Sequence, residues 1–287
     1  MCRPSYKIDA INFVRWPTHG LRTTCVWYNF VMRSFTATLI ENNEILPGTH
    51  LLDVQAPALA RAAQPGHYCM LRGCDSLASD PLLRRPFFVA AVGPGRDVCR
   101  FLVHKRGRAS TWLTRQQPGM SIDLLGPLGR GWTIRPEVRN LLLIGEDPLL
   151  ASLLLLAAHA IEQELSVTLL HCVSSAEQGY PAALLPPEIE YQVFVGAGHP
   201  ETLATQIGAY LAWADSACCS VSENTLTALA HTDIRWREKY FAQAMIDRPL
   251  MCVTGTCQSC QIETRQGPRQ VCRDGPVFAL RDLSGAW

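Results

Sequence analysis

The sequence predicts a β barrel plus an α/β domain, followed by a small C-terminal module built around four cysteines. Three observations support this fold class. Short apolar stretches separated by Pro-Gly turns fill residues 34–135, and apolar stretches alternate with helical patterns in residues 136–235. Four closely spaced cysteines lie in residues 236–287. We take these three ranges as the expected domains.

Residues 1–33 differ in texture from the rest of the chain. They show no clear periodicity and contain one acidic residue, Asp9. We interpret them as an N-terminal extension, either a loosely held tail or the product of an upstream start, with Met32 as the alternative first residue.

The composition excludes several classes of protein. A chain of 287 residues with 48% hydrophobic and 18% charged residues is typical of a globular protein with an ample core. A net charge of +1 without a basic stripe argues against nucleic-acid binding. The most apolar run, 149–158, is shorter than the roughly 20 residues that cross a bilayer. Without a signal peptide, the twelve cysteines favour a reducing, cytoplasmic location and no membrane span.

The first domain should be an antiparallel barrel, because short strands alternate with Pro and Gly turns. The turns fall at 47–48, 65–66, 93–95, 118–119 and 126–127, and one helix is expected at 110–117. The expected strands are 35–41, 50–55, 67–71, 85–92, 99–104 and 121–124.

The second domain should contain a parallel sheet, because buried apolar strands alternate with helices. Strands are expected at 140–144, 166–172 and 191–195, with a helix at 149–164.

The C-terminal cysteines have the spacing C-x4-C-x2-C-x11-C, which matches the plant-type [2Fe-2S] pattern. Gly255 lies where the loop should need a positive φ, and Gly267-Pro268 predicts a hairpin that returns the last cysteine. A zinc ribbon remains an alternative, although it usually has two C-x2-C pairs, as do plain buried cysteines. The predicted ligands are Cys252, Cys257, Cys260 and Cys272.

A lone cluster carries one electron and requires a redox partner, for which the barrel offers a flavin site. The segment 85–88 (Arg-Pro-Phe-Phe) can present strand backbone to a flat ring while the arginine binds a phosphate. Small residues and a hydroxyl at 107–111 open the expected helix, whose free N–H groups suit a pyrophosphate.

Each of these residues also has a structural interpretation. An Arg-Pro pair before an apolar strand is usually structural, and Phe87 and Phe88 could belong to the barrel core. Ser110 could be a simple N-cap, His104 a strand-surface residue and Trp132 an anchor between domains.

Taken in order, the motifs resemble the electron-transfer subunits of dihydroorotate dehydrogenase, within the ferredoxin reductase superfamily. The order is Arg-Pro-aromatic, the 107–110 turn, Gly-Pro-Leu-Gly-x-Gly-aromatic at 126–132, a βαβ domain and the four cysteines. The resemblance covers about residues 34–280 and is most specific at Cys-x-Asp-Gly-Pro-Val-Phe, residues 272–278.

The resemblance implies a bound FAD, a [2Fe-2S] cluster and a catalytic flavoprotein subunit as partner in a hetero-oligomer for pyrimidine biosynthesis. The family usually has Ser at Phe88 and Gly-Thr at Ala109-Ser110. The FAD contacts carried over are Arg85, Pro86, Phe87, Phe88, Leu102, Val103, His104, Ala109 and Ser110.

The nicotinamide half departs from the family pattern, so NAD(H) is a doubtful ligand. A glycine-rich turn is replaced by Gly145-Glu146-Asp147-Pro148, whose carboxylates would repel a pyrophosphate. The family's Cys-Gly-Pro is replaced by Cys218-Cys219-Ser220. Either NAD(H) binds weakly through other groups, or the domain is a retained scaffold, which we favour.

The expected function is electron relay between FAD and the cluster, by a component of an oxidoreductase rather than a complete enzyme. No residue has the character of a base for dihydroorotate oxidation, so no catalytic residue is predicted. The alternatives are a stand-alone NAD(P)H-dependent reductase and a non-enzymatic, cluster-bearing interaction subunit.

Overall fold

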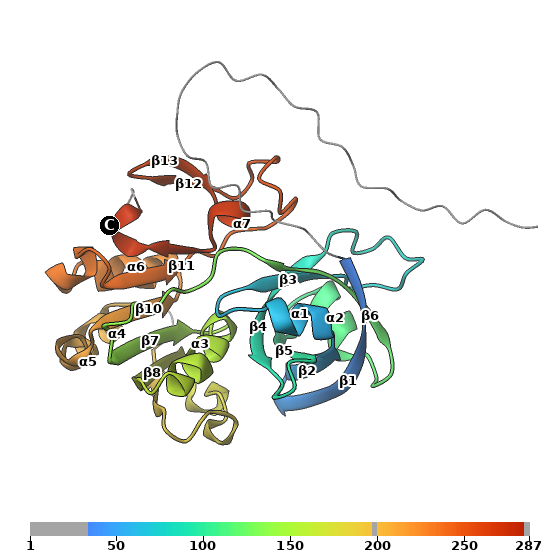
Figure 1. Ribbon diagram of the computed structural model, residues 1–287, viewed down its shortest axis with the longest axis horizontal. Coiled ribbons are helices and arrows are strands. Elements are labelled where there is room, and N and C mark those ends of the chain that lie inside the picture. The colour runs from blue at the N-terminus through green and yellow to red at the C-terminus, as the bar shows by residue number, and fades with distance from the viewer. Residues whose placement is uncertain (1–33, 197–199, 284–287) are drawn as a thin grey trace, which may run out of the picture. The chain divides into compact units, whose positions relative to one another are not determined.

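The computed structural model describes residues 34–196 and 200–283. The proposed extension, residues 1–33 with Met32, lies outside the described residues. The described chain forms a closed antiparallel barrel, a six-stranded and mainly parallel sheet, and a two-stranded hairpin (Figure 1). This is the predicted fold class. None of the described helices has the length and apolar character needed to span a membrane.

The barrel contains all six predicted strands, in the order β1-β2-β5-β4-β3-β6. Its inner face follows the alternation of the sequence: in β6, Ile122, Leu124 and Leu128 are buried between more exposed neighbours. The strands are β1 (Ser34–Leu46), β2 (Thr49–Gln55), β3 (Tyr68–Leu71), β4 (Arg85–Val92), β5 (Val98–His104) and β6 (Ser121–Leu128).

One predicted turn is wrong, because Gly126-Pro127 lies inside β6 rather than at its end. The pairing of β3 with β6 shifts register between Tyr68 and Met70, which accommodates the proline within the strand. Gly126 is needed for packing, since a Cβ there would lie 2.6 Å from the sulfur of Cys69.

The barrel also carries two short helices, α1 (Pro57–Ala62) and α2 (Arg108–Thr114). Helix α1 was not predicted, because six residues are too few for a helical period to stand out. Helix α2 was predicted at 110–117 but begins two residues earlier, after Gly107 as N-cap. Ser110 is therefore a first-turn residue and not the N-cap.

The second sheet has the order β14-β11-β10-β7-β8-β9, and all of its pairs are parallel except β11 with β14. The three predicted strands appear as β7, β8 and β9. Strand β10 was missed because its sequence, Ser-Ala-Cys-Cys-Ser, has no large apolar side chain although all five residues are buried. The strands are β7 (Asn140–Glu146), β8 (Ser166–Val173), β9 (Glu190–Val195), β10 (Ser216–Ser220), β11 (Ala242–Met245) and β14 (Val277–Ala279).

Helices connect and cover these strands (Figure 1). The predicted helix at 149–164 is α3, which buries seven residues against the sheet and the barrel. The α-helices are α3 (Ala151–Glu162), α4 (Pro200–Gln206), α5 (Gly208–Trp213) and α6 (Glu223–Ala230). Short 3-10 turns are η1 (Ala176–Gln178), η2 (Ala182–Leu184), η3 (Ile234–Arg237) and η4 (Leu280–Asp282).

The cysteine module contains the predicted hairpin, β12 (Gln261–Thr264) and β13 (Gly267–Gln270), followed by α7 (Val271–Asp274). Gly267 has a φ of +95° at the turn, a conformation that favours glycine. After α7 the chain returns to the sheet, where β14 pairs with β11. The module is therefore connected to the sheet by backbone hydrogen bonds.

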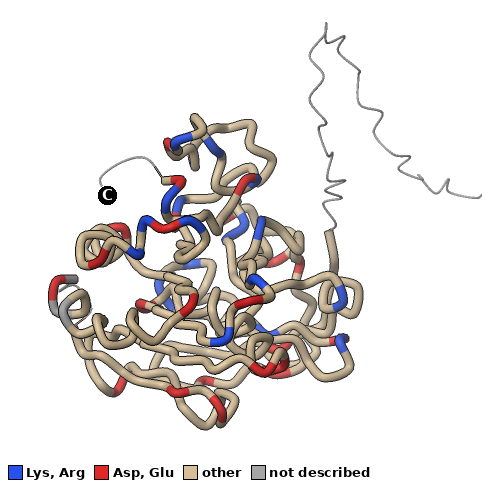
Figure 2. The backbone as a smooth tube through the Cα atoms, turned by 60° about the vertical axis from the view of Figure 1, so that its left-hand side comes forward, with Lys and Arg blue, Asp and Glu red and all other residues tan. Residues whose placement is uncertain are grey.

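Barrel and sheet are joined by buried contacts, and Trp132 is one of them. Its indole nitrogen donates a hydrogen bond of 2.9 Å to the carbonyl of Ser152 in α3. This is the anchoring role considered from the sequence. Figure 2 shows Lys and Arg interspersed with Asp and Glu along the described chain, in line with a net charge of +1.

Candidate functional site

A pocket of about 440 Å³ lies where β4, β5 and the start of α2 meet the segment before α3. Eight of the nine residues expected to contact FAD line it, although they come from three separate stretches of sequence. We call this the flavin pocket. Those eight residues are Arg85, Pro86, Phe87, Phe88, Leu102, His104, Ala109 and Ser110.

Val103 is the ninth predicted contact, and its side chain lies elsewhere. It is fully buried in the barrel core. Neighbouring strand residues point to opposite faces, so Leu102, Val103 and His104 cannot all face one pocket. Only the backbone of Val103 could contribute to the site.

The two phenylalanines of β4 are half-buried and face different surroundings. Phe87 packs partly against the barrel core, as the structural interpretation allowed. Phe88 instead packs against the two clusters in which barrel residues meet residues of the sheet domain. At the pocket rim, the exposed Arg85 donates a hydrogen bond of 2.9 Å to the Leu83 carbonyl.

His104 has a buried nitrogen without a protein partner. Its Nδ1 is 3.1 Å from the hydroxyl of Thr49, whereas Nε2 is buried and unpaired. Burial lowers the pKa of His104, which favours the neutral ring at pH 7. A buried polar atom without a partner calls for an explanation, and a polar ligand in the flavin pocket would supply one.

The turn into α2 is closely built. The Ser110 hydroxyl accepts hydrogen bonds from the N–H groups of Arg106 at 2.9 Å and Gly107 at 3.1 Å, so it holds the turn together. Gly73 makes room for Ala109, because a Cβ at Gly73 would meet the Ala109 Cα at 2.5 Å. Apolar walls and a cationic rim fit a flat ring carrying phosphates.

The four predicted cluster ligands lie in one loop and its return segment, as two linked pairs. The N–H of Cys257 is 3.5 Å from the sulfur of Cys252, and the N–H of Cys272 is 3.4 Å from the sulfur of Cys260. Cys260 and Cys272 are buried, whereas Cys257 is exposed. No three metal-binding side chains in the described residues form a single metal-ion site. Two pairs of thiols suit a [2Fe-2S] cluster, in which two thiolates bind each of the two irons.

The loop around these cysteines bends at three residues with positive φ. Gly255 has a φ of +81°, as the sequence led us to expect. Val253 at +53° and Gln258 at +58° were not expected, because such angles are uncommon for residues other than glycine. Strained backbone of this kind is frequent where a loop wraps a ligand.

The carboxyl ends of β7, β8 and β10 form the edge where open α/β sheets usually bind nucleotides. Here the chain's own side chains fill it. The buried Glu146 carboxylate accepts hydrogen bonds from the Ser222 N–H at 2.8 Å and the Thr225 hydroxyl at 2.9 Å, at the start of α6. It thus takes the place of an anion at a helix N-terminus.

Asp147 continues this arrangement. Its carboxylate lies 3.0 Å from Nε2 of His171, a residue only 1% exposed, whose Nδ1 is 2.9 Å from the Tyr191 hydroxyl. We call these groups together the sheet edge: Glu146, Asp147, His171, Tyr191, Ser222 and Thr225. Cys218 and Cys219 are fully buried in β10, as expected for residues that fill the core.

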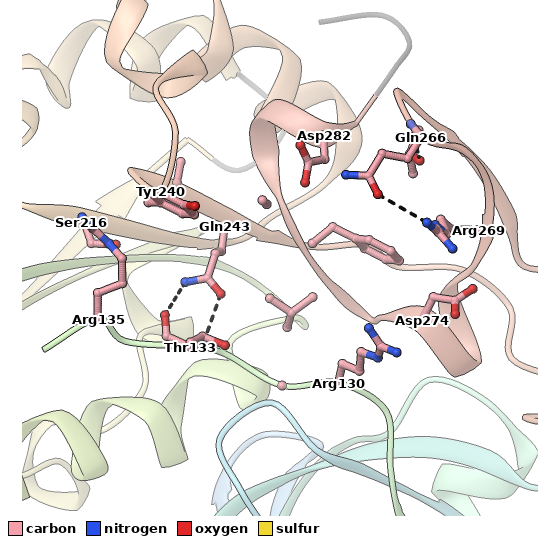
Figure 3. A pocket seen from close by; sticks show the side chains of 16 residues that line it. Arg130, Thr133, Arg135, Ser216, Tyr240, Gln243, Gln266, Arg269, Asp274 and Asp282 are labelled. Carbon is pink, nitrogen blue, oxygen red and sulfur yellow. Dashed lines mark hydrogen bonds between the residues drawn. The ribbon is translucent and has the colours of Figure 1, made fainter. Parts of the chain in front are cut away.

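A further pocket of about 440 Å³ lies between the linker after β6, the start of β10 and β11, and the hairpin (Figure 3). Two hydrogen bonds hold one polar side chain of its wall in place. The Gln243 side chain donates to the Thr133 carbonyl at 2.7 Å and accepts from the Thr133 N–H at 3.1 Å. None of the predicted FAD contacts or cluster cysteines lines it.

Residues 247–284 match the family model described as the iron-sulfur cluster binding domain of dihydroorotate dehydrogenase B. Curated relatives are electron-transfer subunits of dihydroorotate dehydrogenase B (NAD(+)). The subunit of Desulforamulus reducens is 34% identical over 35% of this chain and 37% of its own length. That of Shouchella clausii is 25% identical over 86% and 96%, and that of Geobacillus thermodenitrificans 26% over the same shares.

Solved structures share the fold. A chain of the NADH-dependent reduced ferredoxin-NADP oxidoreductase covers 86% of this chain and 89% of its own, at 18% identity and a TM-score of 0.72. The ferredoxin reductase of carbazole 1,9a-dioxygenase covers 70% and 64%, at 16% identity and a TM-score of 0.56. Over most of its length the chain is therefore similar to dihydroorotate dehydrogenase B electron-transfer subunits, it has a ferredoxin reductase-like fold, and its residues 247–284 match an iron-sulfur cluster binding domain.

Proposed function

We propose that the chain is an electron-transfer subunit in which FAD and a [2Fe-2S] cluster relay electrons to or from a catalytic flavoprotein partner. One observation carries this proposal: three separate stretches of sequence converge on the flavin pocket, in a chain whose residues 247–284 match a cluster-binding domain. By the names of the relatives, the partner would be a dihydroorotate dehydrogenase-like subunit of pyrimidine biosynthesis.

The residues of the chain would bind and orient the cofactors rather than react. Arg85 would pair with a phosphate, and Phe88 and Leu102 would exclude water from the flavin ring. The paired thiols of Cys252, Cys257, Cys260 and Cys272 would hold the cluster. FAD would supply two-electron exchange and the cluster one-electron steps. A cytoplasmic location belongs to the same proposal, because thiolate ligands suit a reducing compartment.

We propose further that the nicotinamide-type domain is a scaffold. The support is the sheet edge, where Glu146 and Asp147 are already paired with groups of the chain itself. A dinucleotide would have to displace buried hydrogen bonds and approach two carboxylates. This favours the relay over a stand-alone NAD(P)H-dependent reductase.

Anaerobic purification of the full chain, with iron and flavin quantified, tests the relay. We expect about one flavin and two irons per chain, and co-purification with a dihydroorotate-oxidising subunit. A chain with iron and no flavin would instead support the interaction-subunit alternative. Titration with NADH tests the scaffold: we expect slow or no flavin bleaching, and rapid stoichiometric reduction would refute it.

A further inference from the structure

One fully buried side chain contacts both the flavin pocket and the cysteine module. Tyr68, in β3, is 0% exposed. The edge of its ring faces Phe88, with ring centroids 6.1 Å apart and an angle of 63° between the planes. Its hydroxyl donates a hydrogen bond of 3.1 Å to the carbonyl of Cys272, which is 204 residues away in sequence. Strand β3 and helix α7, which this bond connects, are labelled in Figure 1.

A backbone junction holds the same two regions together. The N–H of Arg130 donates to the Gly275 carbonyl at 2.6 Å, and the N–H of Val277 donates to the Arg130 carbonyl at 3.3 Å. Arg130 and Asp274, which precedes Gly275, line the same pocket (Figure 3). The segment after β6 is thus hydrogen-bonded to the segment that follows the last cysteine.

Gly129 allows this junction to lie directly on Tyr68. A Cβ at Gly129 would lie 2.9 Å from the Tyr68 ring and 3.0 Å from the Gly275 carbonyl oxygen. Its φ of +88° also favours glycine. Tyr68 is therefore enclosed by Phe88, by the junction and by the Cys272 carbonyl, with no room for solvent.

We propose that Tyr68 is a positioning residue for electron transfer, which fixes the Cys272 end of the cysteine loop against the wall of the flavin pocket. The inference rests on the proposed FAD and [2Fe-2S] relay. Electron transfer slows steeply as the gap between two cofactors widens, so a side chain that contacts both sites controls the rate. The hydrogen bond to the Cys272 backbone would also orient a cluster ligand, an interaction that commonly tunes a metal site.

The electron balance involves no change at Tyr68 itself. A bound cluster, held by Cys252, Cys257, Cys260 and Cys272, would take or give one electron per step as one iron cycles between ferric and ferrous. A bound flavin would supply or accept two such electrons, exchanging its protons with solvent, and the partner's redox centre would be the other end of the relay.

The experiment compares the Tyr68→Phe variant with Tyr210→Phe as a matched control. Both changes remove one hydroxyl and keep the ring, but the Tyr210 hydroxyl bonds Gln192, whereas the Tyr68 hydroxyl bonds Cys272. After a light pulse photoreduces the flavin of the holoprotein, electron transfer to the cluster is followed by transient absorbance, and the reduced cluster is recorded by electron paramagnetic resonance.

In Tyr68→Phe we expect transfer to slow roughly tenfold and the g-values of the cluster to shift, with both unchanged in Tyr210→Phe. If Tyr68→Phe alone lost iron and kept its flavin, this would also support the proposal that the Tyr68 hydroxyl positions Cys272. Full cofactor content with unchanged rate and g-values would show that Tyr68 is only a packing residue. Wild-type protein without flavin would instead sink the proposed function.

A second pair of variants keeps the test decisive if Tyr68→Phe does not fold. Gly129→Ala and Gly119→Ala impose similar backbone strain, because φ is +88° and +91°. Only Gly129 is crowded by Tyr68, since nothing lies within 4 Å of a Cβ at Gly119. We expect Gly129→Ala alone to slow transfer and shift the g-values. Equal behaviour of the two variants would overturn the inference.

Discussion

The flavin pocket and the sheet edge are both places where this kind of fold can hold a nucleotide, yet they differ in how their polar groups are satisfied. In the flavin pocket, Nε2 of His104 is buried and unpaired. At the sheet edge, Glu146 accepts two hydrogen bonds and Asp147 pairs with His171. The difference fits the proposals that the flavin pocket takes a polar ligand and that the nicotinamide-type domain is a scaffold, because buried polar groups are normally paired.

The largest effect should follow removal of a cluster ligand. We expect Cys260→Ser to lose the cluster, with its iron and visible absorbance, because a hydroxyl is a poor replacement for a thiolate. Cys172→Ala, which changes a buried cysteine in β8, should keep the iron. Iron analysis and visible spectra measure this. Full iron content in Cys260→Ser would contradict the assigned ligands.

The next largest effect should follow a substitution at the cationic rim of the flavin pocket. Arg85→Ala should weaken FAD binding about 10- to 100-fold, because a charge-assisted hydrogen bond contributes about 1.5–3 kcal/mol. Arg61→Ala, on the exposed side of α1, is the control. Titration of the deflavinated protein with FAD gives the affinities. Equal dissociation constants for the two variants would count against a phosphate contact by Arg85.

A substitution at the sheet edge should lower the free energy of unfolding and leave reduction by NADH unchanged. Glu146→Ala leaves the Ser222 N–H and the Thr225 hydroxyl without their acceptor, which should lower the free energy of unfolding by about 1–3 kcal/mol. Glu162→Ala, at an exposed position of α3, should change it little. Urea unfolding and NADH titration are measured together. If Glu146→Ala kept its stability and gained rapid reduction by NADH, the proposal that the nicotinamide-type domain is a scaffold would be contradicted.

The smallest effect concerns pH. Burial lowers the pKa of His104, so the unfolded chain binds a proton that the folded chain resists. Nearby Asp147 opposes this shift, whereas Arg106 and His171 reinforce it. The contribution of His104 to stability is complete above its unfolded pKa of about 6.5 and is lost as pH falls toward the folded pKa. Stability should therefore decline below about pH 6.5.

His104→Gln tests this assignment, with His159→Gln on α3 as control. Unfolding midpoints between about pH 7.5 and 5.5 should fall less steeply in His104→Gln than in the wild type or the control. A residual slope is expected from His67, whose pKa burial also lowers. An identical slope in all three proteins would show that His104 does not contribute to this pH dependence of stability.

Local pattern predicted much of the fold. All six barrel strands were expected, because alternating apolar residues between Pro-Gly turns specify a two-sided sheet. The turn at Gly126-Pro127 was wrongly predicted, because the position of these residues inside β6 depends on packing against Cys69, on another strand. Strand β10 was missed because its small residues are buried only through the helices and strands around them. The side chain of Val103 is buried in the barrel core, so its predicted FAD contact could only be made by its backbone, as strand alternation alone already indicates.

By itself, the sequence determined the spacing of the four cysteines, the order of the motifs and the carboxylates at Glu146 and Asp147, because each of these is local. Only the tertiary structure decided what those groups meet. Glu146 finds its donors 76 and 79 residues away, and Tyr68 reaches Cys272 across 204 residues. Side-chain partners of this kind are set by the packing of distant segments, which no local pattern records.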